Sequence, residues 1–141
     1  MLLTVIGVFT VIAPYLADWN ATHVFNPLWS PHAKFHNVQT LAMAVLLGVS
    51  VLLFVWSRGG RTRTNLLPAV LITSFYWTNQ ALAFLYPNVA WTDPNLLNPG
   101  QSLFDFPMQL GLDLVMFLLI ALSALLVLRG SRNETPVLQQ P

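Results

Sequence analysis

The sequence has little charge and no cysteine. Only 8 % of its 141 residues are charged, whereas roughly a quarter of the residues are charged in soluble domains. A soluble domain of this size could not cover its surface with so few charges, so we expect lipid surroundings. The absence of cysteine excludes disulfides, thiolate metal sites and a thiol nucleophile. A net charge of +1 without a basic patch gives no reason to expect nucleic acid as a partner.

Long apolar runs are present instead. Four of them approach or reach the roughly 20 residues that a helix needs to cross hydrocarbon: Leu2–Ala17, Val38–Trp56, Leu66–Leu85 and Met108–Leu128. The first run is short and contains Pro14, but it lacks the basic region of a signal peptide, so we interpret it as a helix. The predicted fold class is all-α: an integral, multi-pass membrane four-helix bundle over residues 1–130. Gly7 and Gly48 are small enough to allow close helix packing.

The arginines predict an orientation for the bundle. Three lie between the second and third runs, and two follow the fourth: Arg58, Arg61, Arg63, Arg129 and Arg132. The positive-inside rule places these segments, and with four spans both termini, in the cytoplasm. The membrane is then the plasma membrane, which in a bacterium is the inner membrane. The polar, proline-containing residues 131–141 are predicted to be a disordered cytoplasmic tail.

The remaining ionisable residues gather on the opposite side. The chain has 5 acids, 3 histidines and one lysine, and all of them except Glu134 lie in segments 18–37 and 87–106 or in the helix ends that meet these segments. Scarce ionisable groups at one end of an apolar bundle predict a polar site there. Such a site is typical of a pocket that orients a ligand through a few polar groups.

The second helix should begin at a defined residue. Ser30 is a good N-cap, and Pro31 is favoured at the first helical position because its missing N–H is not needed there. A helix from Pro31 to about Ser57 would be roughly 40 Å long. Hydrocarbon is only about 30 Å thick, so the first two turns should stand in the headgroup layer.

Those first turns carry His32 and His36, which share a helix face with Gln39. The sequence HAKFH has the spacing of zinc-binding HExxH but lacks its glutamate. A metal ion bound by both rings is one alternative, with a third ligand from Asp18, His23 or Asp113. Nothing nearby demands that ligand, so we predict neither a metal nor another cofactor. Two alternatives remain open for the rings. They act as general acid or base near neutral pH, or they hydrogen-bond the outer loops and headgroups.

Polar residues inside the third and fourth helices reach a similar depth. Asp113 lies about 9 Å along the fourth helix and shares a face with Asp105 and Gln109. A carboxylate within a span costs a few kcal/mol if it faces lipid, so we expect it to face the bundle interior. Asn79 and Gln80 lie about as deep on the third helix. The alternative interpretation is that these amides only join helices by hydrogen bonds.

These observations predict one composite site. The candidate catalytic residues are His32, His36 and Asp113. The candidate substrate-binding residues are Asp18, His23, Gln39, Trp77, Asn79, Gln80 and Gln109.

The string THVFNPLWSPHAKFHNVQ and the four spans resemble a family of small bacterial and fungal membrane proteins, some of which carry an acetyltransferase label. The resemblance covers nearly the whole chain, and Asp18–Gln39 is its specific part. In architecture the chain is also similar to the membrane sterol isomerase and sigma-2 receptor superfamily. The bundles of that superfamily bind sterol-like amphiphiles through inward acids and aromatic rings. The chain departs from that pattern in having one intramembrane acid and a histidine pair. This resemblance implies a lipid-soluble ligand.

Three functions are compatible with these patterns. The first is an acid–base enzyme, isomerase- or cyclase-like, that acts on a lipid-soluble small molecule. The second is a non-enzymatic lipid-binding or accessory membrane subunit. A transporter fits worst, because the sequence has no internal repeat and no polar residue in the cytoplasmic half of a span. Membrane lipids are the expected partners, and the choice between enzyme and binding protein stays open.

Overall fold

The protein is helical throughout most of the described chain. The computed structural model describes residues 1–58, 62–90, 102–103 and 106–130. Its four long helices are α1 (Leu2–Asp18), α2 (Pro31–Val55), α3 (Arg63–Leu82) and α4 (Met108–Gly130). The smaller elements are a 3₁₀ turn, η1 (Ala83–Leu85), and an antiparallel pair of two-residue strands, β1 (Ser102–Leu103) and β2 (Phe106–Pro107). The all-α prediction is confirmed.

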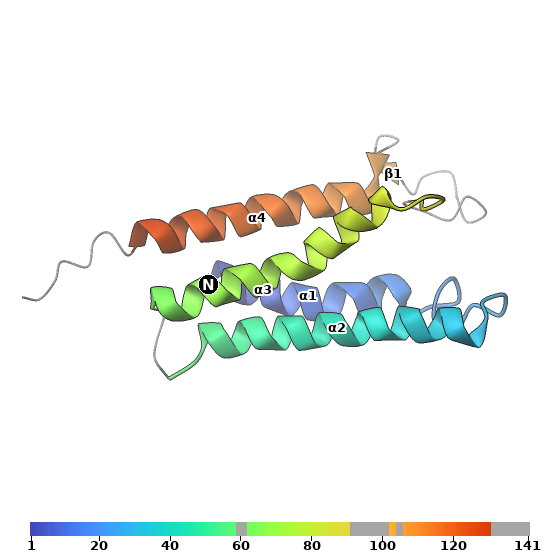
Figure 1. Ribbon diagram of the computed structural model, residues 1–141, viewed down its shortest axis with the longest axis horizontal. Coiled ribbons are helices and arrows are strands. Elements are labelled where there is room, and N and C mark those ends of the chain that lie inside the picture. The colour runs from blue at the N-terminus through green and yellow to red at the C-terminus, as the bar shows by residue number, and fades with distance from the viewer. Residues whose placement is uncertain (59–61, 91–101, 104–105, 131–141) are drawn as a thin grey trace, which may run out of the picture.

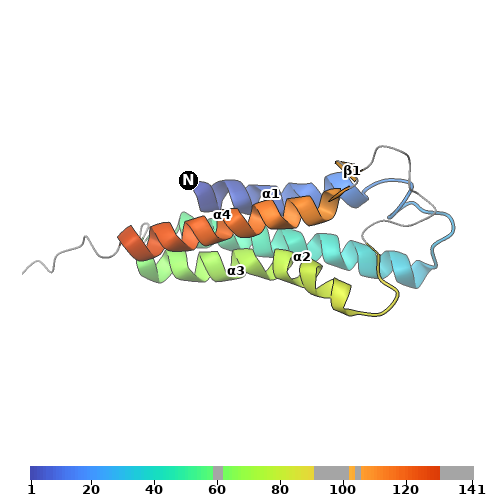
Figure 2. The same ribbon diagram turned by 90° about the horizontal axis from the view of Figure 1, so that it is seen from above.

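The four helices lie lengthwise beside one another (Figures 1 and 2). Along the chain each helix packs against the next, and the α1–α2 interface is the most extensive. The N-terminus, the α2–α3 turn and the end of α4 lie at one end, which we call the arginine end (Figure 1). The loop 19–30 and the start of α4 lie at the other, the loop end.

The described arginines, Arg58, Arg63 and Arg129, lie in the turn or helix ends at the arginine end. Asp18, Lys34 and the three histidines lie at the loop end. The fold therefore separates the described arginines from these other ionisable side chains. The cytoplasmic assignment of the arginine end stays a prediction. Arg61, Arg132, Asp105 and the predicted tail, residues 131–141, lie outside the described residues.

The start of α2 follows the predicted cap. The Ser30 Oγ accepts a hydrogen bond from the backbone N–H of Ala33 at 3.2 Å, and Pro31 is the first helical residue. The cap satisfies one of the backbone donors that a helix start leaves unpaired. It positions the first two turns of α2 beside the loop 19–30.

The α1–α2 interface depends on two glycines. A Cβ built on Gly48 would lie 2.6 Å from the backbone oxygen of Gly7 and 2.5 Å from the Val11 Cγ2. A Cβ built on Gly7 would lie 3.3 Å from the backbone oxygen of Gly48. The two helices therefore cross backbone to backbone, as small residues permit in membrane helices. This confirms the packing role predicted for Gly7 and Gly48.

The outside of the bundle is apolar. Of the most apolar stretches of α2 and α4, only 28 % and 22 % of the residues are buried inside the molecule. The core helix of a soluble protein would be mostly buried, because water on its apolar side chains is unfavourable. By length and composition α2 and α4 can each cross a membrane, while α1, with 17 residues, is a shorter apolar helix.

Candidate functional site

A pocket of about 300 Å³ opens between the four helices toward the loop end. We call it the four-helix pocket. Its walls come from the last turns of α1 and α3, from η1, from Thr40 in the third turn of α2, and from the first turns of α4. Half of the residues that line it are polar: Asp18, Thr40, Tyr76, Asn79, Gln80 and Gln109. The other half are apolar: Ala13, Pro14, Ala17, Trp77, Ala83 and Leu112.

The pocket brings together five of the residues predicted as substrate-binding: Asp18, Trp77, Asn79, Gln80 and Gln109. Those residues come from three different helices and are separated by up to 91 positions in the chain. The structure therefore places these five residues in the wall of one pocket. Whether they bind a substrate stays a prediction.

Asp18 is the most connected acid at this site. Its Oδ2 accepts a hydrogen bond of 2.7 Å from the Nδ2 of Asn37, and its Oδ1 lies 3.8 Å from the Nε2 of His23. Its backbone oxygen also accepts from the N–H groups of Asn20 and Val24. The end of α1, the loop and α2 thus hold one carboxylate in place at the pocket wall.

The ring of His23 has a defined proton arrangement. The Thr22 hydroxyl donates to the Asn20 Oδ1 at 2.6 Å, so it can only accept from the His23 Nδ1, which lies 2.8 Å away. The Nδ1 therefore carries a proton. The Nε2 atom, which faces Asp18, then carries a lone pair when the ring is neutral and a proton when the ring is charged. The ring nitrogen that faces the Asp18 carboxylate is therefore Nε2.

Trp77 contributes its ring to the pocket but not its N–H. The indole is buried, and its Nε1 donates to the Thr10 Oγ1 at 3.2 Å. Thr10 in turn donates to the backbone oxygen of Ile6. Because its polar atom is already bound, Trp77 offers an apolar wall, and the α1–α3 contact fixes its orientation.

Asp113 faces the bundle interior, as expected from its position in an apolar helix. Its side chain is 1 % exposed, and among the described residues neither carboxyl oxygen has a hydrogen-bond partner. Asp113 directly follows Leu112, which lines the pocket. The Tyr76 side chain, also in the pocket wall, is close enough to both Asp113 and Asp18 to interact with them electrostatically. Asp113 therefore does not act as hydrogen-bonding glue between the described helices.

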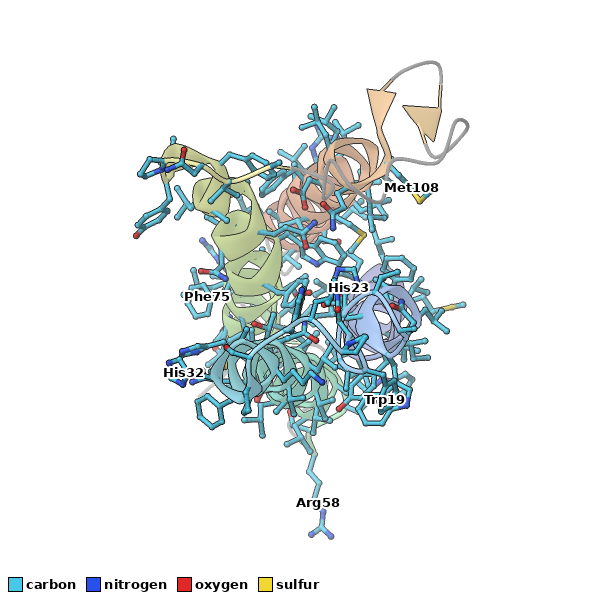
Figure 3. The ribbon with its side chains drawn as sticks, turned by 90° about the vertical axis from the view of Figure 1, so that its right-hand side faces the viewer. Trp19, His23, His32, Arg58, Phe75 and Met108 are labelled. Carbon is cyan, nitrogen blue, oxygen red and sulfur yellow. The ribbon has the colours of Figure 1, made fainter. Side chains whose placement is uncertain are left out.

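His32 and His36 form a separate pair on the outside of α2. Their Nε2 atoms are 3.1 Å apart, and the Nδ1 of His36 is 3.1 Å from the Gln39 Oε1. All three residues are exposed, and neither histidine is among the residues that line the four-helix pocket. Figure 3 shows His32 at the margin of the bundle, with His23 over its middle. The predicted composite site is thus divided in space, and acid–base roles for His32 and His36 stay predictions.

A second hollow adjoins the pocket from the side. It has a volume of about 350 Å³, lies between α2 and α3, and shares Thr40, Tyr76 and Asn79 with the four-helix pocket. Apart from Gln39, its other lining residues are apolar: Met43, Leu47 and Phe75. We call it the α2–α3 groove. It connects the exposed apolar surface of the bundle with the polar wall of the pocket.

Sequence reasoning missed Asn37, Thr40 and Tyr76. Asn37 could have been found, because it begins the series that continues through Leu41 and Ala44 to the buried Gly48 at steps of four and three. Tyr76 carries no such signal, because it lies between two other aromatic residues, the exposed Phe75 and the buried Trp77, and the sequence does not show which of the three faces the pocket.

Comparison with known protein families shows to which family the chain belongs. A model of a family of unknown function (DUF6640) matches residues 2–133. The chain belongs to this family. No curated protein and no solved structure matches it. This match supports the prediction that the chain belongs to a family, but it assigns no function. The acetyltransferase label and the similarity to sterol isomerases stay expectations. Within the described ranges, no group of three or more histidines and acids could hold a metal ion.

Proposed function

We propose that this protein is a four-span integral membrane protein that binds a lipid-soluble small molecule with a hydrogen-bonding head. The single observation that carries the proposal is the four-helix pocket, in which six polar residues from all four helix regions meet six apolar ones. Its volume of about 300 Å³ is at the lower end of the range for ligand pockets.

The surface of the bundle supports the membrane part of this proposal. Large apolar side chains are exposed on all four helices. Exposed Trp19 and Phe25 lie at the loop end and exposed Trp56 at the arginine end. Aromatic residues of this kind favour the two membrane–water boundaries. The bundle then spans the bilayer with its arginine end in the cytoplasm, and its ligand comes from the lipid phase.

The α2–α3 groove supports the lipid-soluble part. It is lined by side chains of α2 and α3 and includes the polar residues that it shares with the pocket, Thr40, Tyr76 and Asn79. An amphiphile can place an apolar tail along Met43 and Leu47 while its head reaches these polar groups. Membrane lipids are the natural competitors for this groove.

A pocket-filling variant tests the binding function. The wild-type protein is purified in detergent, and co-purifying small molecules are identified by mass spectrometry of an organic extract. Ala83→Phe fills the pocket wall and is expected to lose at least 90 % of the enriched compound, a tenfold decrease in occupancy, on the order of 1.4 kcal/mol. Ala42→Phe on the exposed face of α2 is the matched control and should retain it. Equal recovery from both variants would contradict the proposal.

Acid–base catalysis is the second candidate, and the arrangement of Asp18 favours it. Asp18 is in the pocket wall, is held by Asn37, and faces a histidine ring that can gain or lose a proton. Once a ligand is identified, Asp18→Asn should leave its binding intact and slow its conversion by about 10²–10⁴-fold, the usual contribution of a general acid or base. If Asp18→Asn converts the ligand as fast as the wild type does, the catalytic role of Asp18 is wrong and only the binding function is supported.

A further inference from the structure

The histidine pair on the outer face of α2 is not used by the four-helix pocket. His32 and His36 are exposed, and their rings meet edge to face with centroids 4.5 Å apart. Their Nε2 atoms are separated by 3.1 Å. Two imidazole nitrogens bound to one zinc ion, at about 2.0–2.1 Å each in a tetrahedron, would be about 3.3 Å apart. The separation already matches that of two ligands of one ion.

The hydrogen bond to Gln39 sets the proton on one ring. The amide Oε1 of Gln39 can only accept, so the His36 Nδ1, at 3.1 Å, must donate to it. The neutral His36 ring then has its lone pair on Nε2, on the side of His32. Histidine ligands in metal sites are oriented in the same way, by a hydrogen bond from the nitrogen that does not bind the metal.

The His32 ring can become the second metal ligand without a change in the position of its side chain. In the structure the His32 Nε2 shares the proton that links it to His36. When His32 holds its proton on Nδ1 instead, both Nε2 lone pairs are free, and a small rotation of the exposed rings directs them to one point. No covalent bond changes, and the proton moves from one nitrogen of the ring to the other through solvent.

We propose that His32 and His36 form a surface site for a divalent transition-metal ion that prefers imidazole ligands, such as Zn²⁺, Cu²⁺ or Ni²⁺. Gln39 acts as a positioning residue, and solvent provides the remaining ligands. The site lies on the first turns of α2 at the loop end, away from the residues that line the four-helix pocket. It is a binding site and not a copy of a metalloprotease centre, because the glutamate of HExxH is replaced in HAKFH.

Calorimetric titration of Zn²⁺ into the full chain, purified without a histidine tag, tests this site. We expect one equivalent of Zn²⁺ per chain. His32→Gln and His36→Gln should each weaken binding at least tenfold. Gln39→Leu, which keeps both ligands, should weaken it about 10–100-fold by releasing the His36 ring. His23→Gln is the matched control and should bind as the wild type does.

Cu²⁺ provides an independent readout, because electron paramagnetic resonance counts the nitrogens bound to the ion. The wild type should show two imidazole nitrogens, and His36→Gln one. The proposal is overturned if His23→Gln weakens Zn²⁺ binding as strongly as His36→Gln, or if all the variants bind like the wild type. Circular dichroism of each variant compares its total helix content with that of the wild type, so that a loss of binding can be told from a loss of fold.

Discussion

The two faces of α2 show how one helix serves two surroundings. Its inward face places Leu41, Ala44, Gly48, Val51 and Val55 against α1 and α3. Its outward face presents Leu46, Val49 and Leu53 away from the bundle. Both faces are apolar, so hydropathy does not distinguish them. Residue size does, because the inward face carries the glycine that lets α1 approach.

The difference continues into the polar turns of the same helix. Asn37 extends the inward series and donates to Asp18, whereas its neighbour His36 belongs to the outward face with His32 and Gln39. Consecutive residues of a helix are about 100° apart, so adjacent polar side chains can belong to different sites. One short polar segment therefore contributes to both the four-helix pocket and the proposed metal site.

The outward face provides the largest expected effect. Leu46 is exposed near the middle of α2. If this face meets lipid, Leu46→Arg should raise the cost of inserting α2 by about 3–4 kcal/mol, because an unfavourable arginine replaces a favourable leucine. The inserted fraction of a glycosylation reporter that carries α2 measures this cost, with Leu46→Ala as the control. An exposed face in water would tolerate the arginine within about 0.5 kcal/mol, and full insertion of Leu46→Arg would oppose the membrane assignment.

The inward face should be sensitive to a single methyl group. Gly48→Ala places a Cβ where the Gly7 backbone oxygen blocks it, so we expect a loss of about 1–3 kcal/mol in the free energy of unfolding. In an unconstrained helix the same change would stabilise by about 1 kcal/mol, which makes the sign informative. Thermal unfolding in detergent measures the loss, and Ala42→Leu on the exposed face should change stability by less than about 0.5 kcal/mol.

The smallest expected effect is a difference in stability between variants of Asn37 and His36 in the first turns of α2. Asn37→Leu removes the donor to the Asp18 Oδ2 and should lower stability by about 1 kcal/mol, the net value of a typical hydrogen bond. His36→Leu, one residue away on the outward face, should leave stability nearly unchanged. The same thermal measurement compares the two variants. Equal losses would mean that Asn37 and His36 are not separated as the structure places them.

Much of the fold was predictable from local chemistry. Ser30 and Pro31 mark the start of α2, and the apolar runs correspond closely to the four helices. These features depend on residues near one another in the chain, because capping and helix formation are local. The first run was the least certain by length, yet α1 continues through Pro14 to Asp18.

The site was predictable only in part. Asp18, Asn79, Gln80 and Gln109 were predicted to belong to one site and do line one pocket. The joining of His32, His36 and Asp113 into a single centre assumed that polar residues at one end of a bundle meet. In the structure Asp113 is buried and the two histidines are exposed.

The sequence by itself determined which segments are helices and where α2 begins. It also determined that Arg58, Arg63 and Arg129 lie at the opposite end of the bundle from Asp18, Lys34 and the three histidines. Only the tertiary structure decided which polar side chains meet. Asp18 at the end of α1 bonds to Asn37 near the start of α2 and lines one pocket with Gln80 near the end of α3. These residues meet because the helices pack side by side, and their spacing in the chain does not predict the contact. The direction of each side chain around its helix axis then assigns it to the pocket or to the surface.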